Sequence, residues 1–374
     1  MSRSLGVPES GRVAESRRIV ETLAAQYIED VTARCGLRLD AIVSVESVTD
    51  VVFRATLDRE KVIVKCCLSG TSRVRLISVL SRENQVDAAN IVQRVIKPES
   101  DGPSSAEVSY RAAADNARGF PIRVPEVIFS RQNIVAVQDL SPATPLAHTR
   151  TPPHLGPLWE FLNHIWNYGT TPERHTHAIN LAHRHSIEST FERKFNPHYY
   201  RDYLDTLHIG ERARRSLVAL TECVAYHRQR PRARYGLVYG DLKPEHILIG
   251  SSETISVIDP AVHRSSAEAD VARFLGRYST IPGLSERHVV SIDHMEDSEG
   301  PLAHLDRRLI THLLVMDWLN ITTTRSSLGS PTGGVVSDDA KLAEAAHALA
   351  AILTKSTANP YEAARRLASI CAAT

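Results

Sequence analysis

Lysine is scarce in this chain of 374 residues: only seven lysines occur among its 44 basic side chains. The formal net charge is +1, so no bulk electrostatic field attracts nucleic acid or an anionic membrane. No segment approaches the ~18 apolar residues that a membrane-spanning helix needs. The polar N-terminus, MSRSLGVPESGRVAESRR, has no apolar core of a signal peptide. We therefore expect a soluble, cytoplasmic protein that binds neither nucleic acid nor membrane.

Cysteine is also sparse, and its spacing excludes two classes of protein. The chain has five cysteines and no CxxC pair, so neither a zinc centre nor a disulfide framework is indicated. Cys66 and Cys67 are adjacent in a strand-like segment, which places their side chains on opposite faces. This pattern is typical of a reducing compartment.

The first part of the chain mixes helical and strand patterns. A loose tail over residues 1–15 is followed by a helical periodicity over 16–35. Short β-branched segments at 41–48, 51–58 and 61–68 predict an antiparallel meander. Further helices are expected at 80–96 and 106–118, and further strands at 124–130 and 133–140.

The second part of the chain is mostly helical. A proline-containing connector, LSPATPL, precedes a helical region that one strand hairpin at 235–259 interrupts, and a mobile surface loop is expected at 322–338. We predict an α+β fold with an N-terminal tail and helix (1–36), a small antiparallel-sheet lobe (37–140) and a large helical lobe (141–374). Small ligands usually bind where two such lobes meet.

The stretch YGDLKPEHILIGSSETISVIDPA (239–261) contains the two most informative aspartates, Asp241 and Asp259. ILIG and ISVI are strand-like and a four-residue turn separates them, which predicts a hairpin. Because an antiparallel hairpin returns to its starting end, the two carboxylates are expected within ~10 Å of each other. They would share a metal ion or divide the roles of base and metal ligand. The alternative is that each carboxylate only caps a turn.

Lys65 lies in an otherwise apolar strand, VIVKCCL, where burying an ammonium is costly unless an anion meets it. Glu107, near the start of the helix at 106–118, is a natural partner, and Glu83 in the preceding helix is a rival. The alternative is an edge strand on which Lys65 faces water.

These motifs together resemble the protein-kinase-like fold. VIVK with a downstream helical glutamate, YGDLKPEHIL and VIDPA are most similar to the aminoglycoside phosphotransferase and choline kinase group of small-molecule kinases. The resemblance spans about residues 40–280 and implies a bilobal fold. It also implies ATP- and Mg²⁺-dependent transfer of the γ-phosphate to a hydroxyl of an antibiotic, nucleoside, sugar or amino alcohol. Such an activity would serve antibiotic resistance or a biosynthetic step.

Carried over residue by residue, the resemblance assigns roles to this chain. Asp241 would orient the acceptor hydroxyl and take its proton as the catalytic base, and Asp259 would hold Mg²⁺. Lys65 would pair with the α- and β-phosphates, with Glu107 orienting it. Asp270 matches a structural acidic residue behind the site. The backbone of an inter-lobe hinge would bind adenine, and this hinge comprises Val137, Gln138, Asp139 and Leu140.

The chain departs from the family pattern at three places. His246 stands where an asparagine is expected; we assign it to the metal site, through the ion or a metal-bound water, or to a hydrogen bond with Asp241. Hard Mg²⁺ prefers oxygen ligands, whereas imidazole suits Zn, Cu or Fe. Tyr239 replaces a histidine that braces the loop. No glycine occurs between residues 36 and 70, so Ser47 and Thr49 would have to bind phosphates with hydroxyl and backbone N–H groups.

The acceptor is less constrained than the reaction. Residues 151–240 contain twelve Arg or Lys, eight Asp or Glu and nine His, which argues against a strongly cationic acceptor. The histidine-dense run ERHTHAINLAHRHS lacks a completing Cys or carboxylate, which favours a partly exposed helical face over a zinc site. The short segment after Asp259 leaves no room for the activation loop of a protein kinase. An inactive pseudokinase that binds nucleotide as a regulatory module is the alternative function, and His246 and the missing glycines favour it.

Overall fold

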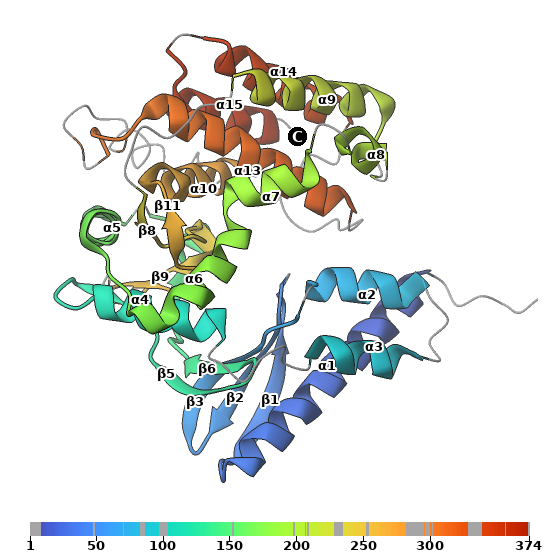
Figure 1. The fold of residues 1–374 in the computed structure, drawn as a ribbon, viewed down its shortest axis with the longest axis vertical. Helices are drawn as coiled ribbons and strands as arrows, with labels where there is room; N and C mark the ends of the chain where they lie inside the picture. The colour runs from blue at the N-terminus through green and yellow to red at the C-terminus, as the bar shows by residue number, and fades with distance from the viewer. Residues whose placement is uncertain are drawn as a thin grey trace, which may run out of the picture. The chain divides into compact units, whose positions relative to one another are not determined.

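The computed structural model divides the chain into two compact units, and Figure 1 labels their elements. Unit 1 comprises Met1–Arg111 and Pro125–Leu140, and unit 2 comprises Ala112–Val124 and Ser141–Thr374. The residues that the structure describes are 9–47, 49–69, 71–82, 87–96, 104–151, 153–196, 199–205, 207, 209–227, 235–251, 254–281, 295, 300, 302–327, 339–355 and 357–372.

A five-stranded antiparallel sheet forms the centre of unit 1, in the order β1-β2-β3-β6-β5. Asp58 and Arg59 join β2 to β3 and both have positive φ, 46° and 77°. This is the backbone of a two-residue hairpin turn whose twist matches the flanking strands. The predicted meander is therefore confirmed. The strands are β1 (Leu39–Val45), β2 (Val51–Leu57), β3 (Glu60–Cys66), β5 (Val127–Arg131) and β6 (Ile134–Gln138).

Three helices share one apolar core with this sheet: α1 (Glu9–Arg34), α2 (Arg73–Arg82) and α3 (Ala88–Ile96). Two expectations for these helices were wrong. α1 begins at Glu9 rather than at residue 16, because Gly11 alone does not end the helix and Val13 packs against the core. The single helix expected at 80–96 is two helices, α2 and α3, and α2 already begins at Arg73, because Leu76, Ile77 and Leu80 bury one helical face.

Unit 2 is built around one buried helix, α10 (Ala267–Thr280). Every residue from Glu268 to Thr280 is buried, and α13 (Arg307–Ser327) and α15 (Pro360–Ala372) pack against it. α10 nevertheless carries charged side chains, which must find partners because burying an isolated charge is costly. In the described parts of the unit, the other helices of eight or more residues are α4 (Ser105–Asn116, which begins in unit 1), α5 (Gly156–Tyr168), α7 (Ile187–Lys194), α9 (Glu211–Tyr226) and α14 (Asp339–Leu353), with the shorter α6 (Thr176–Ala182) and α8 (Tyr200–Asp205).

Two small sheets of unit 2 hold the segment from 236 to 265. One has the order β4-β10-β9-β7 and the other pairs β11 with β8. Their strands are β4 (Ile122–Arg123), β7 (Thr144–Pro145), β8 (Gly236–Val238), β9 (Ile247–Ile249), β10 (Ile255–Val257) and β11 (His263–Ser265). The expected α+β class is confirmed by these sheets and by the helices around α10.

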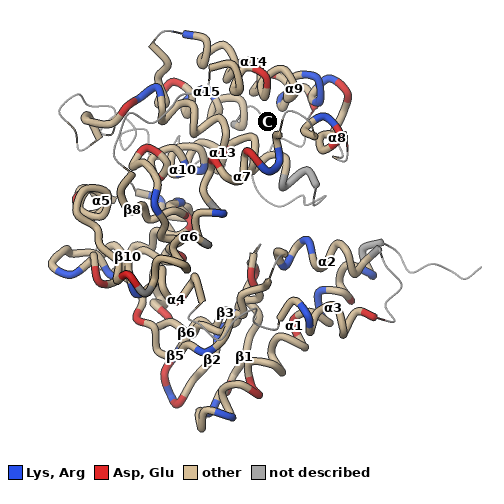
Figure 2. Tube along the Cα trace, in the orientation of Figure 1, with Lys and Arg blue, Asp and Glu red and all other residues tan. Residues whose placement is uncertain are grey.

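Charge and hydropathy agree with the composition. Basic and acidic residues are interspersed along the described parts of both units, with no long stretch of one sign (Figure 2). Among the described residues, no helix is long and apolar enough to cross a membrane. All five cysteines are free thiols, as the sequence predicts.

Candidate active site

The predicted hairpin is present between the two aspartates. β9 and β10 pair antiparallel with Ile249 opposite Ile255 and Ile247 opposite Val257. One further hydrogen bond, from the Ile258 N–H to the His246 carbonyl at 2.9 Å, extends the ladder toward Asp259. Asp241 and Asp259 therefore flank the same end of the hairpin, as expected from the sequence.

Gly240 allows the chain on either side of the hairpin to approach closely. Its φ is +87°, a conformation that side chains rarely adopt, and a Cβ added there would collide with the Ala261 carbonyl oxygen. The Ala261 N–H donates to the Tyr239 carbonyl at 2.9 Å. The segments that contain Asp241 and Asp259 are thus joined directly, through backbone that only glycine at position 240 permits.

Asp270 on α10 holds the loop from behind. Its carboxylate accepts the N–H groups of Tyr239 and Gly240, each at 2.7 Å, and the Trp166 indole N–H at 3.0 Å. The side chain is 1% exposed, and burial raises its pKa above the ordinary value although these donors and Arg273 act in the opposite direction. The geometry gives Asp270 the structural place that the resemblance implies.

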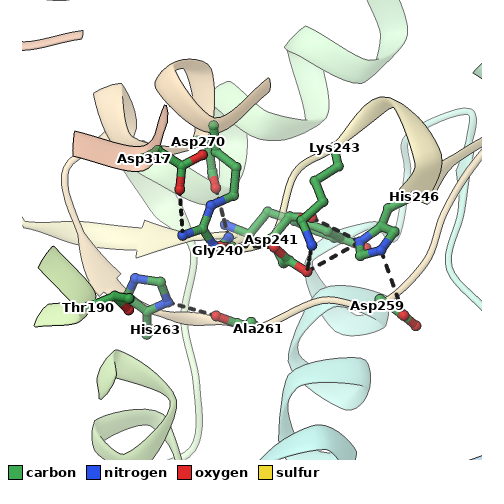
Figure 3. Close-up of polar contacts among 12 residues, drawn as sticks. Thr190, Gly240, Asp241, Lys243, His246, Asp259, Ala261, His263, Asp270 and Asp317 are labelled. Atoms are coloured by element: carbon green, nitrogen blue, oxygen red, sulfur yellow. Dashed lines mark hydrogen bonds and ion pairs between the residues drawn. The ribbon is translucent and has the colours of Figure 1, made fainter. Parts of the chain in front are cut away.

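Three cationic or potentially cationic groups surround the Asp241 carboxylate. The Lys243 ammonium lies 2.7 Å from one oxygen, an Arg273 nitrogen 3.3 Å from the other, and His246 Nδ1 3.5 Å from the first. Figure 3 shows Lys243 and His246 pointing toward Asp241. Burial acts to raise the pKa of Asp241, but these three neighbours outweigh it and hold the pKa well below its ordinary value. Asp241 is therefore ionised throughout the neutral range.

Arg273 connects this carboxylate to the interior of unit 2. It donates to the Gly240 carbonyl and to Asp241, and its other terminal nitrogen lies 3.3 Å from Asp317 of α13. Sequence reasoning missed Lys243, Arg273 and Asp317. Two features of the sequence could have indicated them: Lys243 is one of only seven lysines, and Asp270 and Arg273 have the i, i+3 spacing of one helical face. No pattern in the residues around Asp317 indicates its role.

His246 lies between the two aspartates. Its Nδ1 is 3.0 Å from the Asp241 backbone carbonyl, and its Nε2 is 3.8 Å from an Asp259 oxygen (Figure 3). The described residues contain no group of three or more His, Cys, Asp or Glu side chains able to hold a metal ion. Asp259 and His246 would thus supply two ligands, and nucleotide phosphates and water the others, which is how phosphate-bound divalent cations are usually held. These donors fit a nucleotide-bound cation.

Lys65 is placed in unit 1, where it is 8% exposed on β3 and its ammonium lies 5.5 Å from the centre of the Tyr110 ring. The expected pairing of Lys65 with Glu107 is not found. The Glu107 oxygens are bound instead by Arg111 at 2.9 Å, one helical turn away, and by the Ser130 hydroxyl at 2.6 Å. The rival partner, Glu83, lies outside the described residues.

Ser47 and Thr49 lie in the turn between β1 and β2. The Arg73 N–H donates to the Thr49 carbonyl and the Arg73 guanidinium to the Ser47 carbonyl, both at 2.7 Å. Arg73 is 4% exposed and also pairs with Glu21 of α1. Two carbonyls of this turn are thereby directed toward Arg73, while the role of its hydroxyl and N–H groups in phosphate binding stays a prediction.

Of the four residues from Val137 to Leu140, Val137 and Gln138 end β6 and pair within the sheet, and Asp139 and Leu140 follow the strand. The Gln138 N–H donates to the Glu126 carbonyl at 2.9 Å, and the Asp139 N–H donates to the Lys61 carbonyl at 3.0 Å. Both N–H groups thus already donate hydrogen bonds to carbonyls of unit 1. If this segment binds adenine, recognition must use its carbonyl oxygens or the Leu140 N–H, which narrows the expectation from the sequence.

Comparison with known proteins gives a fold but no close relative. No protein-family model and no curated protein matches the sequence. Among solved structures, spectinomycin phosphotransferase APH(9)-Ia in complex with ADP and spectinomycin aligns with a TM-score of 0.53 at 12% identity, over 91% of this chain and 98% of that chain. Aminoglycoside phosphotransferase APH(4)-Ia aligns with a TM-score of 0.50 at 11% identity, over 88% of this chain and 98% of that chain. The chain therefore has the protein-kinase-like fold of these phosphotransferases, and the expected resemblance is confirmed at the level of the fold.

Proposed function

We propose that this chain is an ATP-dependent phosphotransferase that transfers the γ-phosphate to a hydroxyl of a small molecule. The observation that carries the proposal is the Asp241 carboxylate, kept ionised by Lys243 and Arg273 beside a second aspartate at the same hairpin end. Phosphoryl transfer requires mainly positioning and neutralisation of charge, and little covalent chemistry from the protein. This cluster supplies both.

Asp241 would accept a hydrogen bond from the acceptor hydroxyl and orient its oxygen toward phosphorus. Its lowered pKa makes it a weak base in the resting site, so it would receive the proton only as the new bond forms. Lys243 and Arg273 would stabilise negative charge that develops beside the carboxylate. A divalent cation at Asp259 and His246, when bound, would neutralise the phosphates. Lys65 would serve the α- and β-phosphates.

The acceptor that fits best is a neutral or anionic hydroxyl compound rather than a polycation. The side chains that contact the Asp241 carboxylate are two cations, Lys243 and Arg273, and His246, which is a cation when protonated. Between Asp259 and the start of α10 there is room only for β11, which pairs with β8. This short connection supports a small acceptor rather than a protein substrate. We place the enzyme in the cytoplasm, where ATP is available.

The test is acceptor-dependent release of ADP from ATP with Mg²⁺ or Mn²⁺, over a panel of hydroxylated antibiotics, nucleosides, sugars and amino alcohols. Wild type, Asp241→Ala and the exposed-site control Asp115→Ala are assayed together. Turnover by wild type and the control, lost in Asp241→Ala, is expected. No turnover with any acceptor, together with calorimetric binding of ATP to all three proteins, would favour the regulatory pseudokinase, for which His246 in place of asparagine is the specific observation.

A further inference from the structure

The backbone sets the orientation of the His246 ring. The residue ends the short helical turn Pro244–His246, and its carbonyl accepts the Ile258 N–H at 2.9 Å. Its Nδ1 lies 3.0 Å from the Asp241 carbonyl oxygen, which can only accept a hydrogen bond. The proton therefore lies on Nδ1, and in the neutral ring the lone pair lies on Nε2. Metal-binding histidines commonly have their tautomer fixed by a carbonyl in this way.

The Nε2 atom faces Asp259. It lies 3.8 Å from one carboxylate oxygen, and the Asp259 side chain is 35% exposed. Two ligands that bind one ion at about 2.1 Å and at right angles are about 3 Å apart. A shift of less than about 1 Å in the carboxylate would therefore let both atoms bind the same cation.

A simple ion pair between His246 and Asp241 explains this geometry less well. Nδ1 is closer to the Asp241 backbone carbonyl, at 3.0 Å, than to the carboxylate, at 3.5 Å. The carboxylate already has Lys243 at 2.7 Å and Arg273 at 3.3 Å. The ring is oriented to present Nε2 to Asp259 rather than to neutralise Asp241.

We propose that His246 and Asp259 form a mixed nitrogen–oxygen site that selects divalent transition-metal ions over Mg²⁺; Mn²⁺, which has the lowest affinity in the first-row series, is the probe used below. The inference rests on the proposed function, because nucleotide phosphates and water would complete the coordination. Mg²⁺ demands oxygen ligands, whereas an imidazole ligand favours transition-metal ions. The asparagine typical of the group that the sequence resembles would offer an oxygen at this place, so the preference follows from this one residue.

The first experiment detects the nitrogen ligand directly. Mn²⁺ is added to the full chain with and without ADP, and electron spin echo envelope modulation records the coupling of its electron spin to ligand ¹⁴N. Wild type, His246→Asn and the control His347→Gln are compared; His347 lies on α14, where its ring contacts Ser216. Labelling histidine with ¹⁵N identifies imidazole as the source. Coupling is expected in wild type and in the control, and is expected to disappear in His246→Asn.

The second experiment measures selectivity by calorimetric titration with Mn²⁺ and Mg²⁺ in the presence of ADP. The ratio of the two affinities is expected to fall about tenfold or more in His246→Asn. The comparison between variants removes the preference that ADP itself has for either ion. Asp259→Asn, which keeps the imidazole, should lose Mn²⁺ affinity and provides the test if His246→Asn does not fold.

An imidazole coupling that persists in His246→Asn, or its absence from wild type, would overturn the inference. So would equal affinity ratios in wild type and His246→Asn. These outcomes are distinct from failure of the proposed function, which is judged from acceptor-dependent ADP release. An active enzyme with no imidazole coupling would keep its function and lose only the transition-metal site.

Discussion

Buried charge is handled differently in the two units of this protein. In unit 2, Asp270, Arg273 and Asp317 are all at most 9% exposed, and each carboxylate binds the loop or the guanidinium. In unit 1, Lys65 is 8% exposed within an otherwise apolar sheet, and its ammonium lies 5.5 Å from the centre of the Tyr110 ring. The buried charges of unit 2 thus form a network that reaches Asp241, whereas Lys65 lies on a strand of the sheet in unit 1.

The two regions would serve different steps of the proposed reaction. The chain's own charges position Asp241 before any substrate binds, which is the condition for effective electrostatic catalysis. Lys65 would act on the nucleotide, through the attraction between its ammonium and the phosphates. Substitutions that act on one region and not on the other test this division, and the largest expected effect concerns the reaction itself.

Asp241→Asn should reduce acceptor-dependent ADP release by about 10²–10⁴-fold, because an amide neither attracts the hydroxyl proton nor accepts it. Folding should be kept, since the amide oxygen can still accept hydrogen bonds from Lys243 and Arg273. The assay is steady-state turnover with saturating ATP, alongside thermal unfolding. Undiminished turnover in a folded variant would remove Asp241 from the reaction.

Asp270→Ala should lower the free energy of unfolding of unit 2 by about 3 kcal/mol, because three buried donors lose their acceptor. Denaturant titration followed by circular dichroism measures the change. The control Asp115→Ala removes an exposed carboxylate that pairs with Arg118 at 2.9 Å, and should cost less than about 1 kcal/mol. Equal losses in the two variants would contradict the role of Asp270 as a structural support.

Lys65→Met should weaken ADP binding about tenfold, which is about 1.4 kcal/mol, because the ammonium that would pair with the phosphates is lost. Methionine fills a similar volume in the sheet. Lys61→Met, at an exposed position of the same strand, is the matched control and should bind ADP as wild type does. Calorimetry gives both affinities; if the two variants bind equally well, Lys65 does not contact the nucleotide.

Lys194 provides the smallest effect, a change of stability with pH. Burial lowers its pKa to about 8 in spite of the attraction of Asp317, whereas the unfolded chain has a pKa of about 10.4. Between these values the folded state binds fewer protons, so the contribution of Lys194 to stability rises with pH. The stability of wild type should therefore rise relative to that of a Lys194→Met variant between pH 7.5 and pH 9.5.

Thermal unfolding at these two pH values measures that shift. Lys355→Met, at a side chain 48% exposed, corrects for titration elsewhere in the chain. A difference between wild type and Lys194→Met that stays constant with pH would show that the ammonium is better solvated than its position indicates.

Local patterns explain which parts of the site could be predicted. The hairpin between Asp241 and Asp259 follows from two strand-like segments and a short turn, so a stretch of 23 residues was enough to predict it. Asp270 follows in the next helix and was also found. Lys243 was overlooked, although it lies two residues from Asp241. The predicted pairing of Glu107 with Lys65 was wrong because Arg111, at i+4 on the same helix, binds the Glu107 carboxylate.

The sequence by itself determined the antiparallel sheet, the hairpin and the two aspartates that it brings together. Short-range periodicity and turn chemistry specify these features, since each depends on neighbours along the chain. Only the tertiary structure decided that Arg273 and Asp317, 32 and 76 residues beyond Asp241, complete its electrostatic surroundings. It alone placed the Nε2 of His246 opposite Asp259. Such contacts depend on how α10 and α13 pack in the interior, where burial makes a charged partner necessary and no local pattern names it.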